Sequence, residues 1–123
     1  MKEPADVARA IYQAYVAKDR PAAEALIAAD FHFTSPLDNW IDRSTYFARC
    51  WPNSEHTASF TFIYPLTTDG DRVSVTYESR TTAGKRFRNT EILTVRGEQL
   101  FEVEVYFGWN IPHDALAGKF VDK

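Results

Sequence analysis

The sequence is poor in the features that mark exported and membrane proteins. Cys50 is the only cysteine among the 123 residues, so no disulfide bond can form within the chain. Residues 1–6 lack the apolar core of a secretion signal, and no uncharged run approaches the ~18 residues that a membrane span requires. We therefore expect a soluble, cytoplasmic protein that does not contact membranes.

Basic stripes, glycine-rich loops and metal-ligand spacings are also absent. The net charge is -3 and the lysines and arginines do not cluster, as they must to displace counterions from nucleic acid. The 5 glycines are scattered, so no phosphate-binding loop is present. The 3 histidines lie far apart, and no second cysteine could complete a zinc site. We expect no cofactor, no metal and no nucleic-acid partner.

Hydrophobic residues, by contrast, make up 45% of the chain, and aromatic residues make up 15%. A chain of this length buries roughly two-thirds of its unfolded surface on folding. No repeat, linker or low-complexity tract interrupts it. The sequence therefore predicts a single domain over residues 1–123.

The N-terminal part has the spacing of two amphipathic helices. Six apolar residues recur at helical spacing and predict a first helix with one apolar face, namely Val7, Ala8, Ile11, Tyr12, Tyr15 and Val16. Asp6 is expected to cap this helix. Asp19 is expected to cap the second, where Pro21 is tolerated in the first turn. The alanines of the second helix, through Ala29, would let the two helices approach closely.

Segment 31–42 joins these helices to the rest of the chain. Residues 31–35 alternate as a short strand, which Pro36 ends because proline has no N–H to donate. An acidic, aromatic loop follows. Asp42 is expected to cap a third helix, on which Tyr46 completes a hydrophobic staple. The loop joins the helical layer to a sheet, so we expect it to line a pocket between them.

From Thr57 onward the apolar residues alternate with a period of two, which predicts long strands. Turns are expected at 68–71 and 83–84. The last two strands each have one mostly apolar face, formed by Phe87, Asn89, Glu91, Leu93 and Val95 in one strand and by Phe101, Val103, Val105, Phe107 and Trp109 in the other. Helices followed by meandering strands predict an α+β domain, in which a cone-shaped, curved, mostly antiparallel sheet wraps around three N-terminal helices.

This order of elements, with Ser35-Pro36 ending the short strand, a capped helix from Asp42 and a last strand through Val105-Tyr106-Phe107, resembles the nuclear transport factor 2-like superfamily, a cystatin-like architecture. Within it the SnoaL-like and steroid Δ-isomerase-like proteins are most similar. The resemblance covers essentially the whole chain. It implies an often dimeric domain with a hydrophobic pocket between sheet and helices. Members include isomerases, cyclases, dehydratases, hydrolases and noncatalytic carriers, so the fold does not fix the reaction.

The resemblance also implies a place for the general base. In the isomerases an aspartate stands directly before the proline, whereas this chain has Ser35 there and Asp38 three residues later. Asp38 lies in the loop at the expected pocket mouth, where a carboxylate can take a proton from a ligand. The alternative is a turn aspartate that bonds to its own backbone.

The hydrogen-bonding groups of the isomerase pattern are matched in part. Ile11 falls near the oxyanion-site tyrosine, with Tyr12 and Tyr15 as neighbours, and Trp51 falls at a supporting tyrosine on the third helix. Glu91 falls near the protonated acid. Of these positions, only that of the protonated acid carries a matching residue in this chain.

Glu91 is the first catalytic candidate on its own chemistry. Strand alternation puts it among apolar neighbours, where desolvation raises the pKa of a carboxyl and suits it to act as a general acid or a neutral donor. The alternative is a structural pair with an arginine. Asn89 would face the same cavity and orient a carbonyl group or a water.

The expected ligand is a small, flat or polycyclic, apolar organic molecule. Its predicted binding residues are Tyr12, Tyr15, Phe33, Ser35, Trp51, Tyr64, Tyr77, Asn89, Phe107 and Trp109. His56 is a candidate for the histidine that a dehydratase would need beside an acid; the alternative is a half-exposed surface residue. On the outer sheet face, arginines such as Arg88 recur beside Glu102 and Glu104, which indicates a solvated or dimer-forming surface.

The sequence leaves three functions open. The first is a cofactor-independent isomerase, cyclase or dehydratase, in which Glu91 is the acid and Asp38 the base. The second is a noncatalytic binder of a hydrophobic ligand in the same cavity, which the missing aspartate before Pro36 favours. The third is an interaction domain that acts through the sheet face, for which a filled interior is expected.

Overall fold

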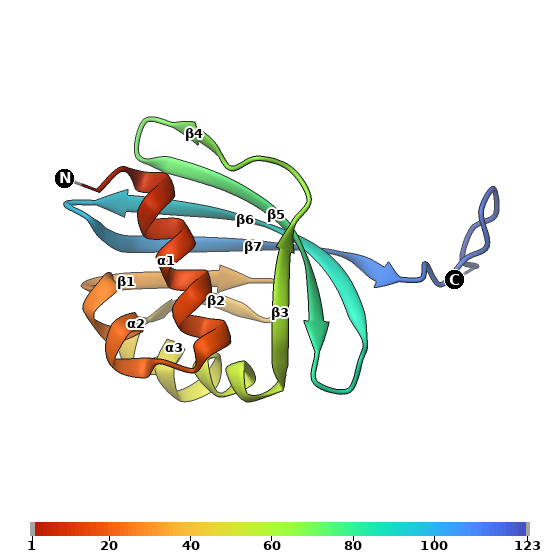
Figure 1. The fold of residues 1–123 in the computed structure, drawn as a ribbon, viewed down its shortest axis with the longest axis horizontal. Helices are drawn as coiled ribbons and strands as arrows, with labels where there is room; N and C mark the ends of the chain where they lie inside the picture. Colours follow the sequence, from red (N-terminus) through yellow and green to blue (C-terminus); the bar gives the residue numbers. More distant parts are fainter. Residues whose placement is uncertain (1, 123) are drawn as a thin grey trace.

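In the computed structural model, which describes residues 2–122, helices cover one face of a curved sheet (Figure 1). The helical elements are α1 (Pro4–Ala17), α2 (Arg20–Leu26), α3 (Arg43–Arg49) and the 3-10 helix η1 (Trp51–His56). The strands are β1 (Ile27–Ser35), β2 (Asp38–Asp42), β3 (Thr57–Phe62), β4 (Thr67–Asp69), β5 (Arg72–Thr81), β6 (Arg86–Arg96) and β7 (Gln99–Ile111). This arrangement confirms the predicted α+β class.

The strands of the described chain form one seven-stranded sheet in the order β2-β1-β7-β6-β5-β3, with β4 paired to β5. Strands β1 and β7 run parallel, and the other neighbours run antiparallel. The sheet curves around α1 without closing into a barrel (Figure 1). The predicted curved, mostly antiparallel sheet around three helices is therefore confirmed.

The hydrophobic core lies between α1 and the inner face of the sheet. Val7 and Ile11 on α1 are buried, as their helical spacing predicts. They belong to one cluster with alternate residues of the strands, including Val75 and Leu93. Burying an aliphatic side chain of this size stabilises the fold by roughly 1.5–3 kcal/mol, so this shared face holds α1 on the sheet.

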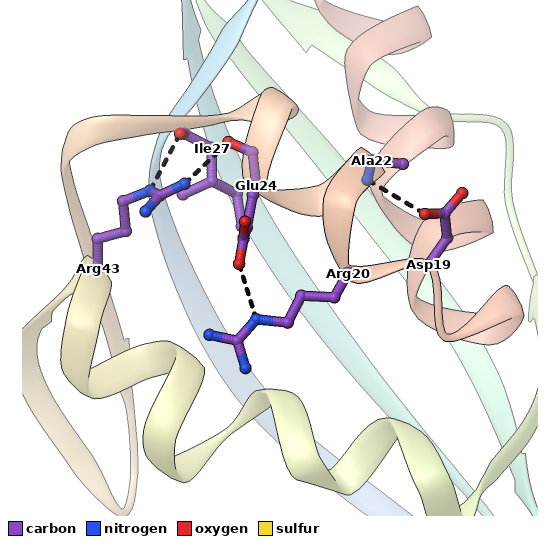
Figure 2. A network of polar contacts seen from close by, with 6 residues as sticks. All are labelled: Asp19, Arg20, Ala22, Glu24, Ile27 and Arg43. Atoms are coloured by element: carbon purple, nitrogen blue, oxygen red, sulfur yellow. Dashed lines mark hydrogen bonds and ion pairs between the residues drawn. The ribbon is translucent and has the colours of Figure 1, made fainter.

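Polar contacts at both ends of α2 fix where β1 begins (Figure 2). The Asp19 carboxylate accepts a hydrogen bond from the Ala22 N–H at 3.2 Å and caps the start of the helix. At the other end, the Arg43 guanidinium donates to the carbonyl groups of Glu24, at 2.9 Å, and Ile27, at 3.4 Å. These acceptors would otherwise lack partners at a helix end. The second helix therefore stops at Leu26, and the expectation that it reaches Ala29 and that the strand starts at Phe31 is wrong.

Helix α1 also begins earlier than predicted. Pro4 occupies the first turn, where its missing N–H costs nothing, and Glu3 is the N-cap residue. The Asp6 carboxylate accepts a hydrogen bond from the Glu3 N–H at 3.2 Å, from inside the first turn. The prediction that Asp6 is the cap is wrong, whereas Asp42 does cap α3 and accepts from the Thr45 N–H at 2.9 Å.

The segment predicted as an acidic loop contains a strand. Pro36 ends β1 as expected, but the chain reverses over two residues and pairs antiparallel with β1 as β2. The reversal is held by the Ser35 hydroxyl, which accepts a hydrogen bond from the Leu37 N–H at 3.0 Å. His32 stacks on Trp40 across this hairpin, with ring centroids 4.2 Å apart.

A bulge near the start of β7 moves one predicted core residue off the inner face. Thr94 pairs with Glu102 while Val95 pairs with Leu100, so Phe101 is an extra residue that breaks the alternation. Leu100 takes the buried position, and the Arg96 guanidinium lies 3.4 Å from the centroid of the Phe101 ring. The prediction that Phe101 faces the core is wrong.

A second bulge lies near the end of β7. Asn89 pairs with Phe107 and Phe87 pairs with Asn110, so two residues of β6 face three of β7. Asn110 pairs with Phe87 and takes the inner-face position that was predicted for Trp109. The Trp109 side chain is 54% exposed. Trp109 borders a second hollow of about 300 Å³ around Gly108 instead.

The segments after β3 and β7 lie outside the sheet. Strand β3 ends at Phe62, before a bend that leaves Tyr64 63% exposed, so the predicted alternation through Tyr64 is wrong. Beyond β7 the chain extends away from the domain (Figure 1), with Leu116 and Phe120 exposed. None of the helices within residues 2–122 is long and apolar enough to cross a membrane, and the cytoplasmic location stays a prediction.

Gly108 at the second bulge gives a test of this account. A Cβ atom at this position would lie 2.3 Å from the backbone carbonyl oxygen of Arg88, so Gly108→Ala should destabilise the fold by about 1–3 kcal/mol in urea unfolding, the usual cost of overpacking. Gly84→Asn is the matched control, because nothing lies within 4 Å of its added Cβ and asparagine tolerates a left-handed backbone. Equal stability of Gly108→Ala and the wild type would contradict the bulge geometry.

Candidate functional site

A cavity of about 410 Å³ lies between the sheet and the helices. Its wall is formed by α1, α3 and η1 on the helical side and by β1, β3, β5, β6 and β7 on the sheet side, with the β1–β2 turn. Cavities of this size hold small organic molecules. The interior therefore contains a cavity, whereas the interaction-domain hypothesis predicts a filled interior.

Glu91 enters this cavity from the inner face of β6. Its neighbours across the sheet are Val75 and Val105, which are both buried. The Tyr12 hydroxyl donates to Glu91 Oε1 at 2.8 Å, and the Tyr77 hydroxyl donates to Glu91 Oε2 at 2.6 Å. Each carboxyl oxygen thus has one tyrosine partner, one from α1 and one from β5.

Asn89 extends this group toward the second bulge. Its Nδ2 donates to the Tyr77 hydroxyl at 3.2 Å, and its Oδ1 accepts from the Gly108 N–H at 3.2 Å. The backbone contact fixes which way the amide points, because Oδ1 faces a donor. We name Tyr12, Tyr77, Asn89 and Glu91 the acid cluster.

Burial dominates the protonation equilibria of the acid cluster. Burial raises the pKa of Glu91, although hydrogen bonds from Tyr77 and Tyr12 act in the opposite direction. Burial and the nearby Glu91 carboxyl raise the pKa of Tyr12 and of Tyr77, so both tyrosines keep their protons at neutral pH. The cluster can therefore supply hydrogen-bond donors to a ligand.

The number of hydrogens in the cluster decides what it can offer. Two O–H···O contacts join Glu91 to the tyrosines. With Glu91 ionised, the two tyrosine hydrogens fill both contacts. With Glu91 neutral there are three hydroxyl hydrogens for two contacts, so one is free to donate to a ligand oxygen. The raised pKa of Glu91 thus favours the form that has a donor to spare.

Asp38 belongs to a second polar group in the cavity wall. The Ser35 hydroxyl donates to Asp38 Oδ2 at 2.8 Å, and Cys50 Sγ lies 4.0 Å from the same oxygen. Arg49 Nε lies 3.6 Å from Asp38 Oδ1. Burial, reinforced by the charge of Asp38, raises the pKa of the Cys50 thiol to about 11, which makes it a neutral donor and not a nucleophile.

Most of the predicted site residues line the cavity. Those in its wall are Tyr12, Tyr15, Phe33, Ser35, Asp38, Tyr77, Asn89, Glu91 and Phe107. Trp51 lies behind the wall, buried at the start of η1, where its ring packs edge-on against Tyr15 with centroids 5.4 Å apart. Tyr64 and Trp109 are exposed and outside the wall, because β3 has ended and the second bulge has shifted the alternation.

Several lining residues are missing from the predicted binding residues. Tyr46 and Phe60 line the cavity, and both belong to the aromatic residues that the sequence offers as its boundary. Ser79 lines it from the inner face of β5, where alternation with Tyr77 was an available signal. His56 also lines the cavity, but no carboxylate among residues 2–122 forms a hydrogen bond with its imidazole.

No group of three or more potential metal ligands exists within the described part of the chain. The two polar groups of the cavity are held by side-chain hydrogen bonds and one ion pair. Their chemistry is that of proton donors and acceptors in an apolar space.

Comparisons with known proteins agree with this architecture. A family profile described as the SnoaL-like domain matches residues 8–103, which is most of the chain. A search of curated proteins found no match.

Several solved structures share the fold at low sequence identity. IdmH, a candidate polyketide cyclase from Streptomyces antibioticus, is 20% identical with a TM-score of 0.69, over 85% of this chain and 91% of that one. A candidate ketosteroid isomerase from Kribbella flavida is 19% identical with a TM-score of 0.71, over 85% and 77% of the two chains. A designed protein with a curved sheet is 12% identical with a TM-score of 0.72, over 88% of each chain. Such likeness establishes the fold and leaves the reaction to the site.

The buried Glu91 carboxyl predicts a specific pH dependence of stability. In the unfolded chain its pKa is about 4.3, and folding raises that pKa. The stabilisation of the neutral carboxyl is therefore complete below the unfolded pKa and is lost as the pH rises through the folded pKa. Urea unfolding should be measured for the wild type and for Glu91→Gln across this range. The free energy of unfolding of the wild type, minus that of Glu91→Gln, should fall with rising pH. A difference that stays constant would contradict a raised pKa.

Proposed function

This chain belongs to the family of SnoaL-like domains, and we propose that it is a cofactor-independent enzyme that moves a proton on an apolar carbonyl compound. The observation that carries the proposal is a buried acid, held by two tyrosines, in a cavity that also contains a second carboxylate. An isomerase, a cyclase and a dehydratase all use such a pair. The polyketide cyclase and ketosteroid isomerase descriptions of two structural neighbours support this reaction class.

The acid cluster is the proposed site for the carbonyl oxygen of the substrate. Neutral Glu91 leaves one hydroxyl hydrogen of the cluster free, and a donor aimed at a developing oxyanion in a water-poor cavity stabilises the transition state. Asn89 keeps Tyr77 oriented through its bond to the hydroxyl. Tyr15 adjoins the cluster on α1, and its hydroxyl lies 3.4 Å from the Cys50 carbonyl oxygen.

Asp38 is the proposed general base. It is 12% exposed and lies in the same cavity wall, so a ligand there is within its reach directly or through a water. Its carboxylate takes a proton from the carbon next to the substrate carbonyl. The electron pair of the broken C–H bond forms the C=C bond of an enolate, and the carbonyl π electrons move to the oxygen, which the acid cluster stabilises. In a β,γ-unsaturated substrate this enolate is a dienolate, and return of the proton to its γ carbon re-forms the carbonyl group and completes an isomerisation.

Exchange of ketone protons with solvent tests this function without the natural substrate. 2-Tetralone is flat, apolar and enolisable, and its α-protons should exchange for deuterium faster in the presence of the protein, as measured by NMR in D₂O. Asp38→Asn and Tyr12→Phe should each slow the catalysed exchange by about 100-fold, the scale of losing a general base or an oxyanion donor.

Asp30→Asn is the matched control, because Asp30 is exposed and pairs with Arg96 outside the cavity. It should exchange 2-tetralone like the wild type. Wild-type exchange that Asp38→Asn leaves intact would contradict the role of Asp38. Binding of 2-tetralone without any exchange would contradict catalysis altogether.

A noncatalytic ligand carrier is the second candidate function. Its specific support is that Ser35 stands before Pro36 and donates its only hydroxyl hydrogen to Asp38 Oδ2, while Arg49 approaches Asp38 Oδ1. Both oxygens of Asp38 thus already have a polar partner in the ligand-free protein. In that case 2-tetralone raises the unfolding temperature and its α-protons exchange at the uncatalysed rate.

We also propose that the outer face of the sheet joins two copies of this chain, as the resemblance implied. Tyr106 on β7 is 55% exposed, and Arg86 and Arg88 both form ion pairs with Glu78 on the neighbouring strand. An exposed aromatic residue among fixed charges suits a symmetric contact.

Light scattering after size-exclusion chromatography should give a dimer mass for the wild type and a monomer mass for Tyr106→Glu, because a buried unpaired charge disfavours the contact. Leu116→Glu, in the exposed segment beyond β7, is the control and should remain dimeric. A monomeric wild type would contradict this interface.

A further inference from the structure

Tyr46 carries a feature of the cavity that the proposed reaction does not use. Its side chain comes from α3, lines the cavity and is only 8% exposed. Its ring packs against Phe31, Phe33 and Phe47, with centroid distances of 5.2, 5.3 and 5.4 Å. Within residues 2–122 no side chain or backbone group forms a hydrogen bond with its hydroxyl, in contrast to the hydroxyls of Tyr12, Tyr15 and Tyr77.

The Tyr46 hydroxyl contributes no hydrogen bond to the fold of residues 2–122. A phenylalanine would make the same ring contacts, so the packing of the core does not require the hydroxyl. Burial raises the pKa of Tyr46, so the group remains a neutral O–H donor. A ligand in the cavity can accept a hydrogen bond from it.

The hydroxyl is separate from the acid cluster in origin and in bonding. The acid cluster is built on α1, β5 and β6, whereas Tyr46 stands on α3, one turn before Cys50. Cys50, the residue that follows α3, has its Sγ 4.0 Å from Asp38 Oδ2. Tyr46 therefore offers a donor from α3 to the cavity that also contains the acid cluster, where a ligand can meet it with a second oxygen.

We propose that Tyr46 is a second polar anchor, which donates a hydrogen bond to an oxygen that the ligand carries in addition to its reacting carbonyl group. The substrate class is then a flat, apolar carbonyl compound with a hydroxyl or keto oxygen on a distant ring. The inference rests on the proposed function in that it takes the acid cluster as the carbonyl site.

Paired probes test this anchor. The affinity of 2-tetralone, which has one oxygen, is compared by calorimetry with the affinities of its derivatives that carry a hydroxyl on the aromatic ring. The wild type should prefer at least one hydroxylated derivative, and Tyr46→Phe should lower that preference about three- to tenfold, the scale of one hydrogen bond. Tyr64→Phe is the matched control, because Tyr64 is exposed outside the cavity, and it should keep the preference.

Thermal unfolding of the ligand-free protein gives a second readout. Tyr46→Phe should unfold at the same temperature as the wild type or higher, because no protein partner is lost. Tyr12→Phe, which removes the bond to Glu91, should unfold at a lower temperature. A lower unfolding temperature for Tyr46→Phe would show a structural partner and overturn the proposal.

The outcomes separate this anchor from the proposed function. If 2-tetralone binds, and Tyr12→Phe weakens that binding, but no hydroxylated derivative gains affinity through Tyr46, the anchor is overturned and the acid cluster stands. If 2-tetralone and all its hydroxylated derivatives fail to bind the wild type, both proposals are overturned.

Discussion

The structure depends on a carboxyl group placed in an apolar interior and held there by two hydroxyl groups. Glu91 stands at the centre of the curved sheet, between buried valines of β5 and β7. A lone carboxylate there would be costly, because ions lose their hydration when they are buried. Tyr12 and Tyr77 reduce this cost and at the same time join α1 and β5 to β6. The same contacts therefore attach a helix to the sheet and create the donor group of the cavity.

The cavity wall divides its polar groups by chemistry. The acid cluster lies where burial raises the pKa of a carboxyl group, which favours its neutral form. Asp38 has a serine hydroxyl, a thiol and a guanidinium as its neighbours. The cavity thus contains two carboxyl groups in different surroundings. Tyr46 adds a donor that neither group uses, so the cavity has more polar capacity than a single carbonyl group requires.

Local patterns in the sequence placed the strand residues of the acid cluster on one face. They did not predict the hydrogen bonds among these residues or the full shape of the cavity. Period-two alternation placed Glu91, Asn89 and Tyr77 on the inner face, because β5 and β6 pair there without interruption. The same rule failed for Phe101 and Trp109, since each bulge in β7 adds one residue, and the extra residue is visible only in the pairing with β6. The aromatic residues, Tyr46 among them, were candidates for the boundary of a cavity, but only the tertiary structure shows that the Tyr46 side chain lines it.

The protonation state of Glu91 tests the central claim most directly. Carbon-13 NMR of the glutamate side-chain carboxyl groups, with Glu91→Gln used to assign the resonance, follows this one group through a pH titration. The account predicts a Glu91 resonance that titrates above the ordinary glutamate value of about 4.3. A Glu91 carboxyl that ionises at the ordinary value would contradict the account, because the cluster would then have no hydrogen to offer at neutral pH.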